Sequence, residues 1–165
     1  MAVKMRDAVR GADDALVWSI LKPAVEAGDT LCAEPDGGMA GGLAYFWAET
    51  ARVWIAEDDG VALGCWYIKP NQTGNGAHVC NAGYCTSPAA RGKGVARAML
   101  AASLDEARRQ GYRAMQYNFV VATNTRAVAT WERAGFAVVG RLPGAFKHPE
   151  QGYVDALVMF KDLTK

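Results

Sequence analysis

The stretch that decides the fold of this chain reads Arg91-Gly92-Lys93-Gly94-Val95-Ala96. It follows an uncharged, strand-like segment, residues 77–86, and precedes an amphipathic segment with the period of a helix. Small residues let the backbone curl tightly at such a turn, and the first N–H groups of the following helix lack intrahelical partners. The positive end of the helix dipole points the same way. The stretch therefore predicts a turn that binds an anion such as a pyrophosphate, with a solvated basic turn as the alternative.

Two other phosphate-binding loops are excluded by the residues at this turn. A Walker A loop needs Gly at the position of Ser87 and Ser or Thr at the position of Gly94. A Rossmann fingerprint needs Gly at the position of Arg97. The turn fits neither class of nucleotide-binding protein.

Length and charge limit the possible functions. The chain has 165 residues, of which 51% are hydrophobic, so we expect a single domain over residues 1–165. A formal net charge of +1, with both signs interspersed, excludes an extended basic surface for nucleic acid or an anionic membrane. Residues 70–90 carry no formal charge, but their Asn, Gln, His and Gly residues exclude a membrane span.

The cysteines predict a reducing environment and no metal site. They form no C-x-x-C pair, and the chain has only two histidines. Cys65, Cys80 and Cys85 lie in strand-like apolar runs, so we expect buried, reduced thiols. The first residues include Lys4 and Arg6 and lack the apolar core of a signal peptide. Both observations predict a cytoplasmic protein.

Hydrophobic periodicity and turn residues predict seven strands and four helices in the order βααβββαβαββ. The strands are expected at residues 3–9, 52–56, 61–68, 77–86, 113–121, 136–141 and 153–160. The helices are expected at about residues 13–28, 43–49, 94–110 and 125–134. Asp13 or Asp14 is expected to cap the first helix, and Pro23 to bend or split it. Asp58-Asp59-Gly60 is expected to close a hairpin.

Two patterns resemble the GCN5-related N-acetyltransferase (GNAT) superfamily. Arg91-x-x-Gly94-x-Ala96 resembles the family's turn for the pyrophosphate of acetyl-CoA, and Asn124-x-x-Ala127-x-x-x-Trp131-x-x-x-Gly135-Phe136 resembles a following helix. The resemblance implies an α/β (α+β) GNAT fold: a mixed, mostly antiparallel sheet of about seven strands with four flanking helices, splayed between the fourth and fifth strands. It implies acetyl-CoA as co-substrate, contacted by Tyr84, Cys85, Thr86, Arg91, Gly92, Lys93, Gly94, Val95, Ala96, Arg97, Asn124, Ala127 and Trp131.

Some of these contacts have a structural alternative. By the resemblance, Tyr84, Cys85 and Thr86 act through their backbone groups on the pantetheine arm, so Cys85 is expected to be a buried, inert thiol. Asn124 either caps the helix that follows it or also faces the pantetheine arm.

The chain departs from the family at the groups that move protons. Trp131 replaces the tyrosine that usually protonates the departing thiolate, and an indole N–H is not a usable acid. Tyr84 or Tyr117 could supply that proton, or the thiolate leaves unassisted. The usual glutamate base is absent as well, which leaves His78, either a base or a structural hydrogen-bonding group, or a base relayed through water.

Two asparagines interrupt strand-like segments and need hydrogen-bond partners. One interpretation is structural: Asn81 and Asn118 lie in a β-bulge or are buried with their side chains bonded to the backbone. The other is functional: both side chains line the reacting site on the splayed strands. Their segments resemble yeast acetyltransferases that detoxify proline analogues such as azetidine-2-carboxylate. That resemblance places Asn81 at the reacting centre. It also implies that Asn118 and the backbone at Phe119 bind the substrate carboxylate. The segment from Gly144 to His148 resembles phosphinothricin-type amino-acid acetyltransferases.

The sequence thus predicts an acetyl-CoA-dependent N-acetyltransferase acting in a ternary complex on a small amine, an amino or imino acid. Catalysis is assigned to Asn81, Asn118 and Tyr117, and substrate binding to Asn81, Asn118 and Phe119. The alternatives are a polyamine or protein N-terminal acetyltransferase and a non-catalytic acyl-CoA-binding module. The family resemblance implies a homodimer, and the charge distribution predicts no nucleic acid or membrane partner.

Overall fold

The computed structural model describes residues 3–165, and this part of the chain follows the predicted order of elements. Its strands are β1 (Lys4–Asp7), β2 (Arg52–Asp58), β3 (Val61–Pro70), β4 (Val79–Thr86), β5 (Ala114–Val121), β6 (Ala137–His148) and β7 (Gly152–Asp162). Its helices are α1 (Asp14–Ala27), α2 (Gly38–Phe46), α3 (Val95–Arg109) and α4 (Thr125–Arg133), with short 3₁₀ turns at Pro35–Gly37, Gly74–Gly76 and Pro88–Ala90. The described strands form a seven-stranded sheet in the order β1-β2-β3-β4-β5-β7-β6.

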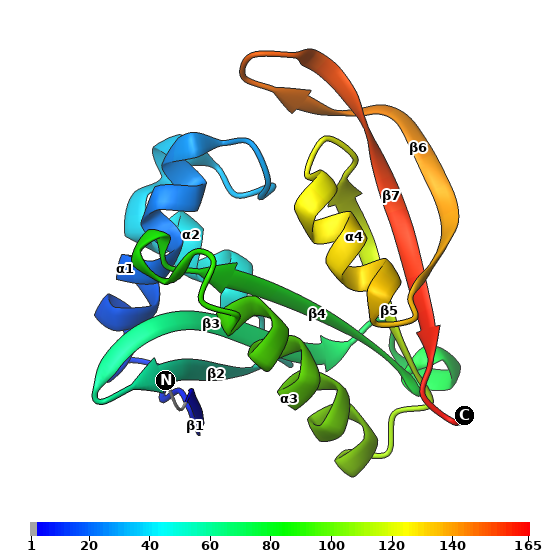
Figure 1. Cartoon of the computed structure of the whole chain (residues 1–165), viewed down its shortest axis with the longest axis horizontal. Helices are drawn as coiled ribbons and strands as arrows, with labels where there is room; N and C mark the ends of the chain where they lie inside the picture. Colours follow the sequence, from blue (N-terminus) through cyan, green and yellow to red (C-terminus); the bar gives the residue numbers. More distant parts are fainter. Residues whose placement is uncertain (1–2) are drawn as a thin grey trace.

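The sheet divides between β4 and β5, its parallel pair. Their pairing joins Val79, Cys80 and Asn81 to residues 114–116 and goes no further. Beyond Asn81, β4 continues beside β3 to Thr86 and β5 continues beside β7 to Val121. Figure 1 shows the two strands diverging from this short common segment. The predicted splay between the fourth and fifth strands is confirmed.

Two hydrophobic cores cover the two faces of the sheet. Because side chains alternate along a strand, Cys65 and Tyr67 of β3 pack with α1 and α2, whereas Trp66 and Ile68 pack with α3 and α4. Figure 1 shows α3 and α4 together on the near side of the sheet. The division of the sheet is therefore flanked by a helix pair on each face.

The predicted β2–β3 hairpin is confirmed. Asp58 pairs with Val61, and the two turn residues have positive φ angles of 48° at Asp59 and 78° at Gly60. This conformation suits the right-handed twist of the strands and favours Asp-Gly.

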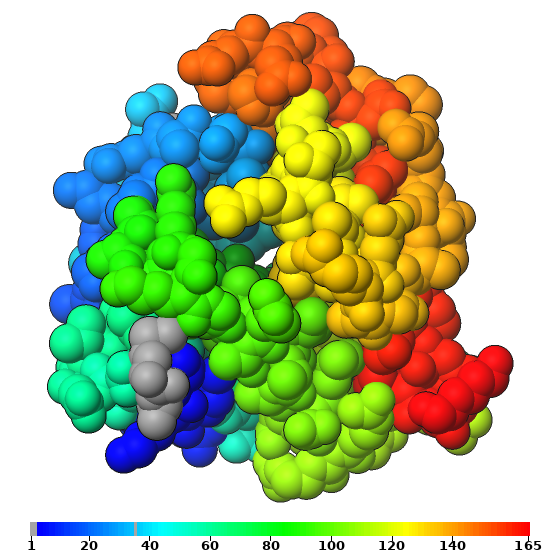
Figure 2. Space-filling model, in the orientation of Figure 1, coloured from blue at the N-terminus to red at the C-terminus, as the bar shows by residue number. Residues whose placement is uncertain are grey.

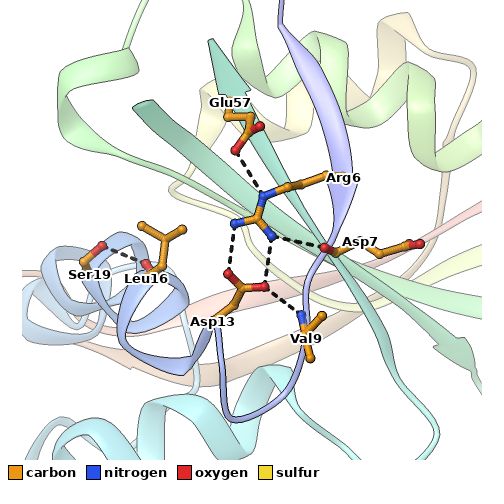
Figure 3. A network of polar contacts seen from close by, with 7 residues as sticks. All are labelled: Arg6, Asp7, Val9, Asp13, Leu16, Ser19 and Glu57. Carbon is orange, nitrogen blue, oxygen red and sulfur yellow. Dashed lines mark hydrogen bonds and ion pairs between the residues drawn. The ribbon is translucent and has the colours of Figure 1, made fainter. Parts of the chain in front are cut away.

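Arg6 joins β1, β2 and the start of α1, as Figure 3 shows. Its guanidinium donates to both carboxylate oxygens of Asp13 at 2.9 Å and to Glu57 Oε2 at 3.1 Å. Asp13 also accepts from the backbone N of Val9 at 2.8 Å, and these bonds lower the pKa of its carboxyl below the ordinary value. Asp13 occupies the N-cap position but makes no side-chain cap bond, because Arg6 and Val9 engage its carboxylate instead.

The structure corrects several predicted element bounds. Pro23 does not split α1. Proline has no N–H to donate within a helix, but Pro23 lies on the solvent-exposed side of α1, where the helix tolerates the lost hydrogen bond. The second helix runs over Gly38–Phe46 instead of residues 43–49, because its glycines allow close packing: a Cβ at Gly42 would collide with the Trp18 ring. Strand β4 starts at Val79, so the prediction of a strand from residue 77 that contained His78 is wrong.

The last two strands are longer than predicted. Pro143 and Gly144 interrupt the sequence pattern of β6, and the pairing with β7 shifts register between Leu142 and Phe146. The carboxylate of Asp155 accepts from the Gly144 backbone N at 3.0 Å and from Arg141 at 2.7 Å. These bonds hold the irregular segment onto β7, so the strand continues to His148.

Candidate active site

A cavity of about 500 Å³ opens where β4 and β5 diverge. Figure 2 shows the surface hollowed between the green segment before α3, yellow α4 and the blue α1–α2 region. The cavity is lined by Thr30, Leu31, Ala44, Tyr45, Ala48, Tyr67, Lys69, Asn81, Ala82, Gly83, Tyr84, Tyr117, Asn118, Phe119, Val120, Val121, Asn124, Ala127 and Trp131. Every residue that the sequence predicted for catalysis or substrate binding is in this set.

Asn81 lies at the point where the two strands part. The residue is 7% exposed. Its Nδ2 donates to the Gln116 carbonyl at 2.9 Å, and its Oδ1 accepts from the Tyr67 hydroxyl at 3.1 Å. The asparagine therefore holds β4 to β5 at their last shared pair, which agrees with the interpretation of a buried side chain bonded to backbone. One Nδ2 hydrogen and one Oδ1 lone pair are left for the cavity that it lines.

Asn118 and Phe119 lie in a β-bulge of β5. The pairing with β7 shifts between Tyr117 and Val120, so these two residues have no register partner on β7. They have none on β4 either, because that pairing ends at Gln116. The Asn118 side chain is exposed, accepts from Gln116 Nε2 at 2.9 Å and donates to Asn71 Oδ1 at 2.7 Å. The bulge predicted as one interpretation of Asn118 is confirmed.

Tyr117 belongs to a chain of hydroxyl groups. Ser103 Oγ donates to the Leu100 carbonyl at 2.8 Å, so it accepts from Tyr84 at 2.7 Å, and the Tyr84 oxygen accepts from Tyr117 at 3.0 Å. Burial raises the pKa of both tyrosines well above the ordinary value, which keeps them protonated at neutral pH. Trp131 packs on both rings, with centroids 5.0 Å from Tyr84 and 5.2 Å from Tyr117.

The turn before α3 has the geometry expected for an anion site. Gly92 and Gly94 both have φ of 77°, and a Cβ at either would project into open space. The first intrahelical bond runs from Ala98 N to Gly94 O at 3.0 Å, and no side chain caps the helix. Its first N–H groups are therefore available to a ligand.

Three basic side chains surround this turn. Arg91, Lys93 and Arg97 are exposed, and none of them has an ion-pair partner among residues 3–165. The residues at this helix N-terminus therefore fit a pyrophosphate.

Asn124 caps α4. Its Oδ1 accepts from the backbone N of Ala127 at 3.3 Å, which confirms the capping interpretation. The same side chain lines the cavity, so the cap does not preclude contact with a ligand.

Two residues considered from sequence lie outside the cavity. His78 is exposed before β4, with Nδ1 3.1 Å from the Asn75 carbonyl. Cys85 points away into the α1 core, where its Sγ donates to the Ile20 carbonyl at 3.4 Å, and burial raises the pKa of its thiol to about 12. Cys85 is thus a buried, protonated thiol, as predicted.

Sequence reasoning missed the cavity wall opposite β5. Tyr67 and Lys69 come from β3, and Tyr45 and Leu31 come from the α1–α2 segment. Lys69 ends an apolar strand next to Pro70, a pattern typical of a solvated strand end. No local signal shows that folding brings these residues to Asn81.

The described residues include no group of three or more His, Cys, Asp or Glu placed to hold a metal ion. Among them there is also no helix long and apolar enough to cross a membrane.

The divided parallel pair, followed by an open helix N-terminus, defines an acetyltransferase fold. The family model described as "Acetyltransferase (GNAT) family" matches residues 19–136. The chain therefore belongs to the acetyltransferase (GNAT) family, and the predicted fold and enzyme class are confirmed.

Individual relatives agree with this assignment. A GCN5-related N-acetyltransferase from Kribbella flavida has a TM-score of 0.90 and 39% identity over 98% of both chains. The N-acetyltransferase aca1 of Schizosaccharomyces pombe is 40% identical over 97 residues, 58% of this chain and 46% of that protein, so the match spans about half the length of this curated relative. A phosphinothricin acetyltransferase from Sinorhizobium meliloti, solved in complex with acetyl-CoA, has a TM-score of 0.83 at 21% identity, over 98% of this chain and 89% of that one.

Proposed function

We propose that this protein transfers the acetyl group of acetyl-CoA to the amine of a small carboxylate-bearing molecule, an amino or imino acid. The observation that carries the proposal is the cavity at the divided strands, whose β4 wall leads directly to the uncapped, basic N-terminus of α3. A nucleotide phosphate on α3 would direct the pantetheine arm along β4 towards Asn81.

The donor side of the site consists of the backbone of β4 and the residues of α4. Beyond Asn81, residues 82–86 have no partner on β5, so their outward N–H and C=O groups can bond an amide-bearing arm as a strand would. Tyr84, Cys85 and Thr86 would contribute backbone groups, and Asn124, Ala127 and Trp131 the opposite wall. When bound, acetyl-CoA supplies the acetyl group as a reactive thioester.

The acceptor side consists of Asn81 and the bulge at Asn118 and Phe119. The unpaired backbone of the bulge and the Asn118 amide can donate to a carboxylate. Asn81 would orient the amine, or a water that takes its proton, through the Nδ2 hydrogen and Oδ1 lone pair left over from its bonds to Gln116 and Tyr67.

The reaction forms a bond between the amine nitrogen and the acetyl carbonyl carbon and breaks the carbon–sulfur bond. A water-relayed base takes the amine proton, since His78 lies outside the cavity. Tyr117 is the candidate donor to the departing sulfur, because it lines the cavity and stays protonated. Its hydroxyl hydrogen, which bonds Tyr84 in the free protein, would turn to the sulfur. Trp131 packs beside it, with ring centroids 5.2 Å apart.

The lining argues against a polyamine acceptor, because none of the described residues around the cavity is acidic. A reducing, cytoplasmic location is supported by Cys65 and Cys85, which face each other across β3 and β4 as free thiols. A homodimer and a role in detoxification stay predictions from the family resemblance.

Thiol release from acetyl-CoA tests the proposal. The panel would contain azetidine-2-carboxylate, proline and small amino acids, the amide of each, spermidine and a short peptide. We expect kcat/KM for the acids to exceed that for their amides by at least about tenfold, because unpaired polar groups in the site penalise the amide. Equal turnover of the amides would remove the carboxylate claim, and no turnover of any amine would favour a non-catalytic acyl-CoA-binding protein.

A further inference from the structure

Lys69 is the one formally charged side chain among the described residues that line the cavity. It is half-buried at the end of β3, and no described carboxylate lies within ion-pair distance of its ammonium group. Its ammonium instead lies over the Tyr67 ring, 5.6 Å from the ring centroid. A partly desolvated cation in a cavity without an anion is unpaired, so it would be stabilised by binding an anionic group of a ligand.

The register of the sheet places this cation beside the residues assigned to the acceptor. Lys69 is directly opposite Asn81, and Asn81 is directly opposite Gln116. Paired residues share a face of the sheet, and Asn118, two residues beyond Gln116, points to that face as well. A ligand lying over this row would therefore meet the ammonium at one end and the Asn118 amide at the other.

Tyr67 fixes the position of the ammonium relative to Asn81. The tyrosine ring supports the cation, while its hydroxyl donates to Asn81 Oδ1 at 3.1 Å. The cation is thus held near the reacting centre by a group that also orients Asn81. A cationic acceptor would be repelled here, whereas an anionic one would be attracted.

We propose that Lys69 binds the carboxylate of the acceptor and thereby determines the preference for amino or imino acids over uncharged amines. This inference rests on the proposed function. It adds a fixed cation from β3 to an anion site that the sequence assigned to Asn118 and Phe119 alone.

Two substitutions at Lys69 test it. Lys69→Met keeps an unbranched chain over Tyr67 and removes the charge, whereas Lys69→Arg keeps the charge. Lys22→Met is the matched control, since Lys22 is exposed on α1, pairs with Glu26 at 3.8 Å and lies outside the cavity. The measurement is kcat/KM for the best amino acid of the panel and for its amide, together with acetyl-CoA affinity by calorimetry.

Lys69→Met is expected to lower kcat/KM for the acid about 10- to 100-fold, mainly through KM, because a charged hydrogen bond is lost. Turnover of the amide and affinity for acetyl-CoA should change less than about twofold. A merely structural role of Lys69 would instead lower turnover of the acid and the amide together. Lys69→Arg should retain most of the preference for the acid, and Lys22→Met all of it.

The outcomes separate the inference from the function beneath it. If the wild-type enzyme prefers acids and Lys69→Met keeps that preference, or loses acid and amide turnover equally, Lys69 does not bind the carboxylate. If the wild-type enzyme already uses amides as well as acids, the proposed substrate class is wrong, and the inference is wrong with it.

Discussion

Helices α3 and α4 start at the same edge of the sheet, after the two parallel strands. They differ in whether a side chain accepts a hydrogen bond from their first N–H groups. At α4 the Asn124 side chain accepts from Ala127 N, and the helix supplies its own cap. At α3 the cap position is Gly94, which has no side chain, and no other side chain replaces it. The α4 start is capped by its own sequence, whereas the α3 start is left uncapped.

A helix start suited to phosphate differs from an ordinary one in how many of its first N–H groups already have a partner. A capped helix has one donor satisfied before any ligand arrives, so it gains less from an anion. An uncapped helix preceded by two glycines with left-handed φ gains more, and three exposed cations add to the attraction.

The largest effect is expected from Gly94→Val. A valine at φ 77° strains the turn by at least about 1–2 kcal/mol and projects into the space where the anion would lie, so affinity for CoA should fall more than about tenfold. Calorimetry measures it. Gly60→Val is the control, because Gly60 has φ 78° and open space but lies in the β2–β3 hairpin. If Gly94→Val folds and binds CoA like wild type, α3 is not the phosphate site.

Removing charge from α3 should have a smaller effect. The double variant Arg91→Gln, Arg97→Gln is expected to weaken CoA binding roughly threefold to tenfold and to flatten its salt dependence, since exposed charges act through a screened field. Titrations at low salt and at about 0.5 M NaCl measure both. Arg133→Gln, an exposed arginine in the last turn of α4, should change neither quantity. An unchanged salt dependence in the double variant would show that the backbone alone holds the phosphates.

Asn124 should contribute more to stability than to binding. Asn124→Ala is expected to lower the free energy of unfolding by about 1 kcal/mol through the lost cap, and Asn124→Asp to restore it. Affinity for CoA should fall only a few-fold in either variant, which urea unfolding and calorimetry would separate. If Asn124→Ala unfolds with the same free energy as wild type, the hydrogen bond to Ala127 does not contribute to stability.

The smallest effect is expected for thiol reactivity. The N-terminus of α3 should not stabilise the thiolate form of any cysteine. Burial raises the pKa of Cys80 and Cys85 to about 12, so both are protonated at pH 8. Cys65 is buried as well, and burial also raises its pKa. Native protein should therefore react with a disulfide reagent first at Cys32, the exposed thiol, although partial burial raises the pKa of this thiol too. The Cys32→Ser variant should show no fast reaction. A fast-reacting thiol in that variant, mapped to Cys85, would show that α3 activates Cys85.

The sequence predicted the parts of the site that depend on local backbone geometry. Gly94 and Asn124 were found because a left-handed turn and a helix cap each restrict the residue at one position. The order of elements and the β2–β3 turn followed from periodicity and from Asp59-Gly60 for the same reason.

Long-range packing decided what the sequence did not show. The helix over Gly38–Phe46 exists because α2 packs closely on Trp18, and Lys69 reaches the cavity only because β3 pairs with β4. Neither contact has a local pattern, so the α2 bounds were predicted wrongly and Lys69 was not considered.

The early end of the β4–β5 ladder would also link the stability of the fold to metabolite supply, if the donor binds along β4 as proposed. Residues 82–86 forgo strand partners on one side in the free protein, and an arm lying in the gap would provide them. A ligand that binds only the folded state adds about 2.7 kcal/mol of stability when present at one hundred times its Kd. The lifetime of this protein would then rise and fall with the concentration of its donor.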